Sequence, residues 1–202
     1  LAPTATPPSS LPREMANMII FKSFRINGLE ATFAYDPATA EVSRINAPWA
    51  FPLAEQQLGP SPDGKFVAFV KRDGSNLPQV HVRSVEFGSE KQITNFSGKG
   101  SDTRSYDAAW SPTGEWIAFA SNNSGNDEIY RVTPDGSIVE QLTFNSWEWD
   151  KHPTWSPDGT KIVFYSNRDT KRRQLWIMNA DGSDQKLLFS NESEDWDPVW
   201  TR

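Results

Sequence analysis

The sequence predicts an all-β fold built from repeated sets of short antiparallel strands, and three observations support this prediction. A Ser-Pro-Asp/Thr-Gly turn recurs at 61–64, 111–114 and 156–159, with spacings of 50 and 45 residues. An apolar strand-like segment follows each of these turns at the same distance. Fifteen Pro and twelve Gly punctuate the 202 residues, which is typical of many short strands joined by tight turns.

Each repeat contains the same series of predicted strands. The first apolar segment lies at 18–21, 66–69, 116–119 and 161–164, and the second at 32–34, 80–82, 129–131 and 175–177. A last strand in each repeat carries Ile45, Ile93, Leu142 or Leu188. Four antiparallel strands in about 45 residues indicate one blade of a β-propeller. An open β-solenoid or a β-sandwich is the alternative, and the regular spacing disfavours both.

The repeats divide the chain into an extended arm at 1–14 and a propeller at 15–202. The blades span approximately 15–47, 48–96, 97–145 and 146–190, and a further strand lies at 195–202. That strand repeats the Trp-Ser/Thr pair of the earlier turns, and the first blade lacks its own first strand. We therefore expect the C-terminal strand to join the first blade and close a ring of four blades. Pairing with a neighbouring molecule, giving a swapped assembly, is the alternative.

The W-S-P-D-G, I-x-F and D-G-S elements resemble TolB-like repeats, which are related to WD repeats. The resemblance covers about 18–202, and three of the four copies match well. It implies a propeller that serves as an interaction platform in the bacterial envelope, or a non-catalytic domain attached to a prolyl-oligopeptidase-type hydrolase. Because one propeller fold serves many functions, the resemblance specifies the fold more closely than the role.

Composition and motifs exclude several classes of function. The net charge of −6 offers no basic face for nucleic acid, and no apolar run is long enough to span a membrane. The chain has no cysteine, no G-x-S-x-G motif and only two histidines, so we expect no enzyme. His81 occupies the strand position of Tyr130 and Trp176 in other repeats and is interpreted as a packing residue.

A cation site is one hypothesis for the centre of the propeller. Asp107, His152 and Asp197 share one position in the innermost strands, and Asp150 and Asp195 precede two of them by two residues. Their oxygen atoms would suit calcium, with carbonyls and waters completing the shell. The alternative is that each carboxylate caps its own turn or pairs with an amide or Arg of a neighbouring blade.

Loop aromatics suggest a second kind of site. Trp147, Trp149 and Trp196 stand beside acidic residues, a combination that can stack on sugars and accept hydroxyl hydrogen bonds. A glycan or an envelope protein would then bind this face. The alternative is that each Trp packs between adjacent blades.

The N-terminal arm suggests self-assembly. It is rich in Pro, Thr and Ser, and the residues expected to mediate docking are Leu1, Pro3, Pro7, Pro8, Leu11 and Pro12. An extended arm suits strand addition to a neighbour's blade, and a head-to-tail contact can build a filament. Such a segment is common after a cleaved signal, so we expect an extracellular or cell-envelope protein. The leading prediction is a structural or interaction scaffold that binds itself, and a glycan- or protein-binding module is the alternative.

Overall fold

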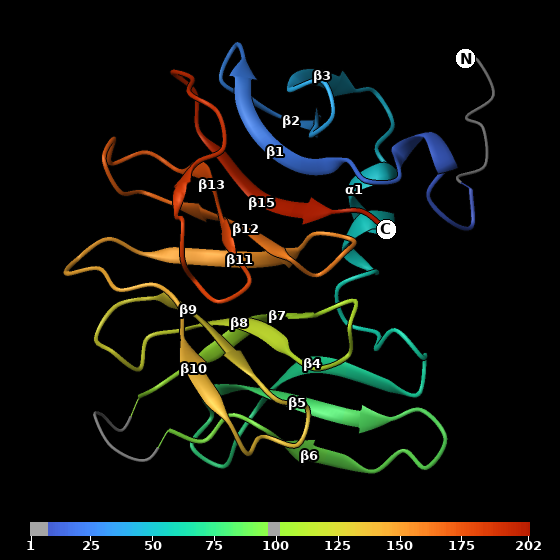
Figure 1. The fold of residues 1–202 in the computed structure, drawn as a ribbon, viewed down its shortest axis with the longest axis vertical. Coiled ribbons are helices and arrows are strands. Elements are labelled where there is room, and N and C mark those ends of the chain that lie inside the picture. Colours follow the sequence, from blue (N-terminus) through green and yellow to red (C-terminus); the bar gives the residue numbers. More distant parts are fainter. Residues whose placement is uncertain (1–7, 97–101) are drawn as a thin grey trace.

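The structure, a computed structural model, describes residues 8–96 and 102–202 (Figure 1). It is an all-β fold of four antiparallel sheets with little helix. We name the sheets A to D in chain order. Their arrangement confirms the all-β class and the repeated antiparallel sheets predicted from the turns.

Three of the sheets contain four strands. Sheet A has the order β15 (Asp195–Trp200), β1 (Ile19–Ile26), β2 (Leu29–Asp36), β3 (Glu41–Ile45). Sheet C has the order β10 (Val139–Gln141), β9 (Glu128–Val132), β8 (Ile117–Ser121), β7 (Ser105–Trp110). Sheet D has the order β11 (Asp150–Trp155), β12 (Lys161–Ser166), β13 (Gln174–Asn179), β14 (Lys186–Leu187).

Sheet B departs from the predicted four strands. It contains only β4 (Phe66–Arg72), β5 (Pro78–Ser84) and β6 (Glu90–Gln92). The residues expected to supply its first strand form the helix α1 (Ala50–Glu55) instead, and only an isolated bridge joins Pro60 to Val67. The helix buries Phe51 and Ala54 beside sheet A. Among the described residues, sheet B also lacks the arginine–aspartate ion pair that joins the first two strands of sheets A and D.

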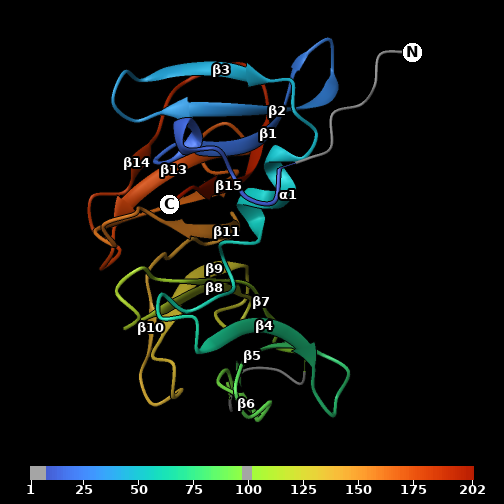
Figure 2. The same cartoon turned by 90° about the vertical axis from the view of Figure 1, so that its right-hand side faces the viewer.

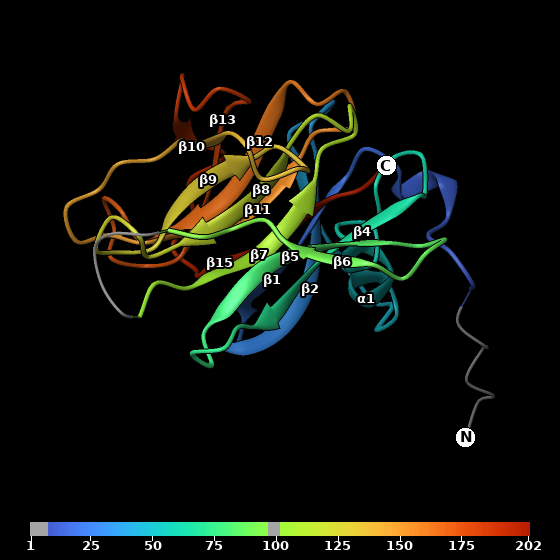
Figure 3. The same ribbon diagram turned by 90° about the horizontal axis from the view of Figure 1, so that it is seen from below.

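The sheets follow one another in the order A, D, C, B from the top to the bottom of Figure 1. Figure 2 shows α1 beside sheet A, and Figure 3 views the molecule from the end at which sheet B lies. Apolar cores fill the spaces between A and D, between D and C, and between C and B. The sheets therefore pack face to face as successive blades do.

One pair of apolar residues recurs at each of these interfaces. Ile162 and Phe164 of sheet D are fully buried against sheet C, and Ile117 and Phe119 of sheet C are fully buried against sheet B. Burying such side chains contributes about 1.5–3 kcal/mol each. The repeated I-x-F element is thus a packing face of sheets C and D, whereas in sheet B the buried residue of the corresponding segment is Ala68.

The Ser-Pro-Asp-Gly turn fastens the strands on either side of it. In the turn at 61–64 the Ser61 hydroxyl donates to Asp63 at 2.7 Å and accepts the Phe66 N–H at 2.9 Å. Gly64 takes a φ of 70°, which a side chain would disfavour. The same hydrogen bonds recur at 156–159. This local geometry explains why the motif repeats.

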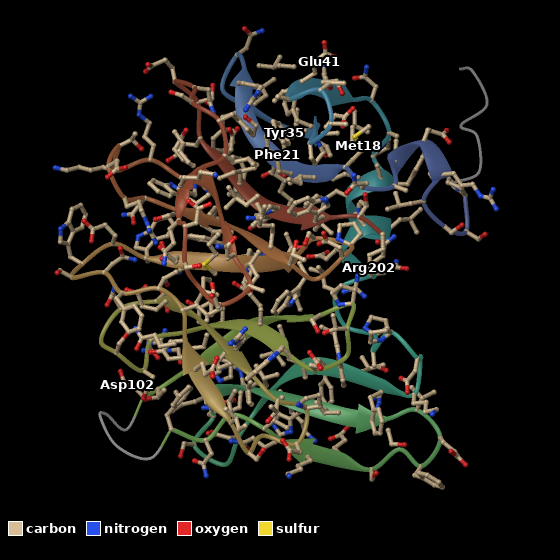
Figure 4. All side chains as sticks on the ribbon, viewed as in Figure 1. Met18, Phe21, Tyr35, Glu41, Asp102 and Arg202 are labelled. Atoms are coloured by element: carbon tan, nitrogen blue, oxygen red, sulfur yellow. The ribbon has the colours of Figure 1, made fainter. Side chains whose placement is uncertain are left out.

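The two ends of the propeller chain meet in sheet A. Strand β15 pairs antiparallel with β1, with Val199 opposite Ile20. The Thr201 hydroxyl accepts the Met18 N–H at 3.0 Å, the contact that Ser61 makes to Phe66 in sheet B. Figure 4 shows Met18 and Arg202 on the same side of the molecule. Segments 183 residues apart thus rebuild the turn contact of the other repeats.

The N-terminal arm is described only from Pro8 onward. A short 3-10 helix spans Arg13–Met15, and Leu11 and Met15 pack against the buried face formed by sheet A and α1. Leu1, Pro3 and Pro7, which were expected to mediate assembly, lie outside the described residues. Within residues 8–96 and 102–202, neither the length nor the hydropathy of any helix suits a membrane crossing.

Candidate functional site

Three sheets each place one bulged residue at the centre of the molecule. We call β7, β11 and β15 the inner strands, because β11 lies against both of the others. Asp107, His152 and Asp197 occupy corresponding positions in them and have φ values of 55°, 50° and 50°. The strand register shifts at each position, which marks a β-bulge. Bulges turn a side chain out of the sheet, and Asp and His tolerate this left-handed backbone better than most residues.

The three bulged side chains meet at one point. His152 Nε2 lies 3.2 Å from Asp107 Oδ2 and 3.3 Å from Asp197 Oδ1. Lys22 of β1 extends the group, with its Nζ 3.0 Å from Asp197 Oδ2. We call Lys22, Asp107, His152 and Asp197 the axial cluster. The sequence placed the three inner-strand members together by their common position, and the structure brings them into contact.

A cavity of about 270 Å³ opens beside the axial cluster. Its walls include Asp107 and His152, the carboxylate residue Glu55, and Phe69 and Val70 of β4. Pro153 and Pro198, which follow two of the bulges, also line it. The cavity is therefore partly apolar and carries two carboxylates on its walls.

Burial makes the axial cluster sensitive to charge. It raises the pKa of Asp107, and the negative charge of Asp197 raises it further, whereas His152 lowers it. The Oδ2 atom of Asp107 is buried and has no hydrogen bond within the described residues. Tyr165 stacks on His152 with ring centres 5.6 Å apart, and burial followed by Asp197 raises its pKa. A positive charge at this point would stabilise the ionised carboxylates.

Asp150 and Asp195, which the sequence grouped with the predicted metal ligands, lie outside the axial cluster in ion pairs of their own. Both are fully buried, and each forms an ion pair with an arginine, Arg168 and Arg25 respectively. Arg25 contacts both oxygens of Asp195, at 2.8 and 2.7 Å. A buried carboxylate is stable only with such a partner, so these two residues serve the fold.

These ion pairs belong to a repeated clamp between the first and second strands. In sheet A, Arg25 Nε donates to Ser23 at 3.0 Å while its terminal nitrogen holds Asp195. Asn191 also donates to Asp195, at 2.7 Å. Sheet D repeats the arrangement with Ser166, Arg168, Asn145 and Asp150. The clamp fixes the start of the inner strand against its neighbour.

The other two sheets replace both members of the ion pair together. Sheet C has Asn123 and Ser105 at the positions of the arginine and the aspartate. Sheet B has Asp73 and Glu55 there, two acids that cannot form an ion pair with each other. In sheet B, where both positions are acidic, the residues before Glu55 form α1 instead of pairing with β4.

Calcium binding stays a prediction. Among residues 8–96 and 102–202 no group of three or more His, Asp or Glu side chains has the arrangement of metal ligands. Asp150 and Asp195 are held by arginines, and Asp107 and Asp197 contact His152. Few oxygen atoms are left free for a hard cation that takes six to eight.

The three tryptophans proposed for a ligand face do not form one surface. Trp196 is 6% exposed and lies in the core between sheets A and D, under the guanidinium of Arg173. Trp149 is half-buried and packs edge-on against Tyr165. Trp147 is 58% exposed, and Phe144, three residues earlier in the sequence, is 74% exposed. Packing between sheets thus accounts for Trp196, and only Trp147 remains open to a ligand.

Sequence reasoning missed the partners of the predicted carboxylates. Lys22 stands where the other repeats have Val70, Ala120 and Tyr165, so a lysine at an otherwise uncharged position was the available signal. The arginines of the clamp could have been found in the same way, because they change together with their aspartates between repeats. Glu55 and Phe69 of the cavity wall gave no comparable signal.

Comparison with known proteins identifies the family whose sequence pattern this chain matches. Residues 52–202 match the family described as the TolB beta propeller domain. An uncharacterized protein of Agrobacterium fabrum is 33% identical over 157 residues, covering 69% of this chain and 50% of that protein. A TolB homolog of Chlorobium chlorochromatii is 36% identical over 108 residues, covering 54% of this chain and 22% of that protein. The chain thus spans half or less of the length of these relatives.

Solved structures show the same fold. TolB from Acinetobacter baumannii has a TM-score of 0.59 and 27% identity, with coverage of 91% of this chain and 43% of that one. A puromycin hydrolase has a TM-score of 0.54 at 16% identity, covering 94% of this chain and 31% of the hydrolase. At that identity the hydrolase shows a shared fold and nothing about activity.

Proposed function

Because the chain belongs to the TolB beta propeller domain family, we propose that it is a four-bladed binding module that recognises a basic segment of a partner protein at its axial cavity. The observation that carries this proposal is the meeting of Asp107, His152 and Asp197, which three different sheets deliver to one point beside the cavity. Side chains that only stabilised their own sheet would not be expected to meet at one point.

The charges at the cavity favour a cationic ligand. Asp107 and Glu55 both lie on its walls, so the cavity carries two carboxylates. A lysine or arginine side chain would supply charge-assisted hydrogen bonds to these oxygens, which are stronger than neutral ones. Phe69 and Val70 offer apolar surface for the stem of such a side chain.

Binding without catalysis is part of the proposal. His152 lies between two carboxylates and stacks on Tyr165, so its ring nitrogen Nε2 is directed at acceptors. A histidine that activated a nucleophile would instead contact a hydroxyl or thiol group. This arrangement supports an electrostatic role for His152.

We also propose a location in the cell envelope or outside the cell. The Pro-, Thr- and Ser-rich segment before Arg13 supports this location, as does similarity to TolB proteins. Fractionation of the source cells, with antibody detection of the protein, would check it. Recovery in the cytoplasmic fraction alone would contradict this part of the proposal.

A random-peptide display library panned against the purified protein tests the main proposal. We expect the selected peptides to be enriched in Lys and Arg. The double variant Asp107→Asn/Asp197→Asn should weaken their binding by about tenfold or more, since it removes the two axial charges. The control Glu41→Gln changes an exposed acid on β3 and should leave binding unchanged. Peptides without basic residues, or equal binding by all variants, would refute the proposal.

Self-assembly through the N-terminal arm is a second proposal. Its support is the Pro-, Thr- and Ser-rich composition of residues 1–12, which suits an extended docking segment. Light scattering and electron microscopy should find particles larger than the 22.8 kDa chain. A variant without residues 1–7 keeps Leu11 and Met15, which pack on their own sheet, and should lose those particles. Particles of unchanged size in that variant would exclude the arm as the linker.

A further inference from the structure

Strand β4 has an open edge that its counterparts lack. Strands β1, β8 and β12 are each flanked along their length by an inner strand and a second strand. Strand β4 pairs fully with β5, but on its other side only Phe66 to Ala68 have a partner among residues 8–96 and 102–202. Within this part of the chain, the second half of β4, from Phe69 to Arg72, has no inner strand beside it.

The backbone groups on this edge have a defined direction. Ala68 N–H donates to the Gly59 carbonyl at 2.8 Å, so the alternate residues Val70 and Arg72 direct their amides to the same side. At the position of Arg72, the corresponding residue Asn122 of sheet C donates its N–H to Arg104 in the segment that enters β7. The edge of β4 therefore lacks hydrogen bonds that this fold makes elsewhere.

The side chains on the edge are also less covered than their counterparts. Val70 is 41% exposed, whereas Ala120 of β8 is fully buried and Tyr165 of β12 is 8% exposed. The cavity beside the axial cluster is continuous with this edge, because Ala68, Phe69 and Val70 form part of its wall. The cavity thus borders the first part of the unpaired half of the strand, at Phe69 and Val70.

The chain's own residues are poorly suited to fill the gap. In sheets A and D an aspartate of the inner strand pairs with an arginine near the end of the adjacent strand, β1 or β12. In sheet B both positions are acidic, Glu55 and Asp73. Two like charges oppose the pairing of residues 50–57 with β4. The same two acids would attract an incoming strand that carries a positive charge.

We propose that an extended segment of a partner protein, carrying a Lys or Arg, adds to β4 as the missing strand of sheet B. Its backbone bonds to the free groups of Val70 and Arg72, and its basic side chain enters the cavity toward Glu55 and Asp107. Strand addition uses main-chain hydrogen bonds for affinity and side-chain pockets for specificity. This inference rests on the proposed function, for which it supplies the mode of docking.

The test uses a fluorescein-labelled octapeptide of alternating Thr and Val with one central Lys. We expect its anisotropy to report binding at least about tenfold tighter than that of the matched peptide with a central Glu. A third peptide, N-methylated at alternate amides, should not bind detectably because it cannot form the ladder. Hydrogen exchange by NMR should show new protection of the Val70 and Arg72 amides. Binding without that protection would overturn the proposal.

Two variants of Val70 test whether peptide binding requires the backbone amide on the open edge of β4. Val70→Pro removes an amide that faces the gap and that β5 does not use, and it should abolish binding of the Lys octapeptide. Val70→Thr keeps the amide and a β-branched side chain and should bind normally. Far-ultraviolet circular dichroism and urea unfolding would establish that both variants are folded. Equal peptide binding by the two variants would refute strand addition.

The result also distinguishes this inference from the proposed function. If library peptides depend on Asp107 and Asp197 but bind Val70→Pro as well as the parent, the axial site stands and strand addition fails. If those peptides bind Asp107→Asn/Asp197→Asn as tightly as the parent, the proposed function fails. Protection of Val70 without peptide, together with a dimer by analytical ultracentrifugation, would show that a second copy occupies the edge, and this would overturn the partner-segment proposal.

Discussion

At the scale of single residues, the axial cluster depends on three unusual backbone conformations. Asp107, His152 and Asp197 all have φ near +50°, a region that costs most side chains about 1–2 kcal/mol. Each follows from a bulge at the same place in its inner strand, so the repeated fold imposes the conformation three times. The residues at these positions are Asp and His, which tolerate a positive φ better than most residues and can also carry charge.

A pair of substitutions at His152 would measure this strain. Because φ is 50°, His152→Ala should be about 1 kcal/mol less stable than His152→Gly, the reverse of the order expected in an ordinary strand. Urea unfolding of both variants at one pH provides the comparison. The same substitutions at Ile177 of β13, a regular strand, should show alanine to be the more stable. A stability order at His152 like that at Ile177 would contradict the bulge.

A buried glutamate should give the protein a pH-dependent stability. Glu128 of β9 is fully buried and accepts hydrogen bonds from Thr143 at 2.6 Å and from the Asn145 N–H at 2.6 Å. Burial, and then the charge of Asp150, raise its pKa from 4.5 to about 7. Between these two values the folded state binds a proton that the unfolded state releases. Stability contributed by this group is therefore present below pH 4.5 and is lost as the pH rises toward 7.

Substitution of Glu128 tests that sign. Between pH 4.5 and 7 the free energy of unfolding of the parent should fall by roughly 1–3 kcal/mol, and Glu128→Gln should remove most of that fall. The corresponding positions in sheets B and D carry Gln79 and Gln174, so glutamine fits this site in the fold. In the converse variant Gln174→Glu, the free energy of unfolding should fall more steeply over this pH range than it does in the parent. Parallel pH profiles for parent and Glu128→Gln would contradict the assignment.

At the scale of secondary-structure elements, the charges at the two clamp positions differ between the sheets with a complete inner strand and the sheet without one. Sheets A and D have the ion pair and a complete inner strand. Sheet C keeps its strand with a neutral Asn and Ser at these positions. Sheet B has two acids there, and its chain forms α1. An ion pair or a neutral pair at these positions thus accompanies a complete inner strand, and two acids accompany its absence.

Exchanging one clamp for another tests this interpretation. Asp195→Ser alone should destabilise the protein by about 3–5 kcal/mol, because it leaves the charge of Arg25 buried and unpaired. The double variant Arg25→Asn/Asp195→Ser copies the pair in sheet C and should recover more than half of that loss. Chemical denaturation of the three proteins gives the coupling energy. Additive losses in the double variant would show that the two residues act independently.

At the scale of the whole molecule, the two ends of the chain complete sheet A together. Strand β15 lies between β1 and the inner strand β11, so it contributes to two interfaces. The Thr201 hydroxyl accepts the Met18 N–H and donates to the Met15 carbonyl. Pairing of distant segments is costly in loop entropy until the intervening sheets have packed. Sheet A is therefore expected to form late in folding.

Removing one hydroxyl group at this junction tests its importance. Thr201→Val keeps the shape of the side chain but leaves the Met18 N–H without its partner, so the free energy of unfolding should fall by about 1–2 kcal/mol. The exposed Thr39→Val on the turn before β3 should change it by less than about 0.5 kcal/mol. An unchanged stability for Thr201→Val would mean that the ends of the chain separate readily. Folding kinetics would then show whether sheet A forms late.

The repeats in the sequence determined the antiparallel sheets, the packing role of the I-x-F element and the common position of Asp107, His152 and Asp197. These features follow from local rules, since a turn motif and an alternating apolar strand act within one repeat. The position of a residue along each repeat is then enough to predict which residues share a level near the axis.

Only the tertiary structure decided which charges meet. Asp150 meets Arg168 through the hairpin of β11 and β12. Asp195 meets Arg25, and Asp197 meets Lys22, because β15 returns to pair with β1. The helix α1 likewise occupies the place where the repeat pattern predicts an inner strand, and the edge of β4 is left open beside it. Strand identity is a local property, but the satisfaction of buried charges depends on segments as far apart as 175 residues. The physical reason is that a charge is tolerated away from water only where the fold supplies its counterpart.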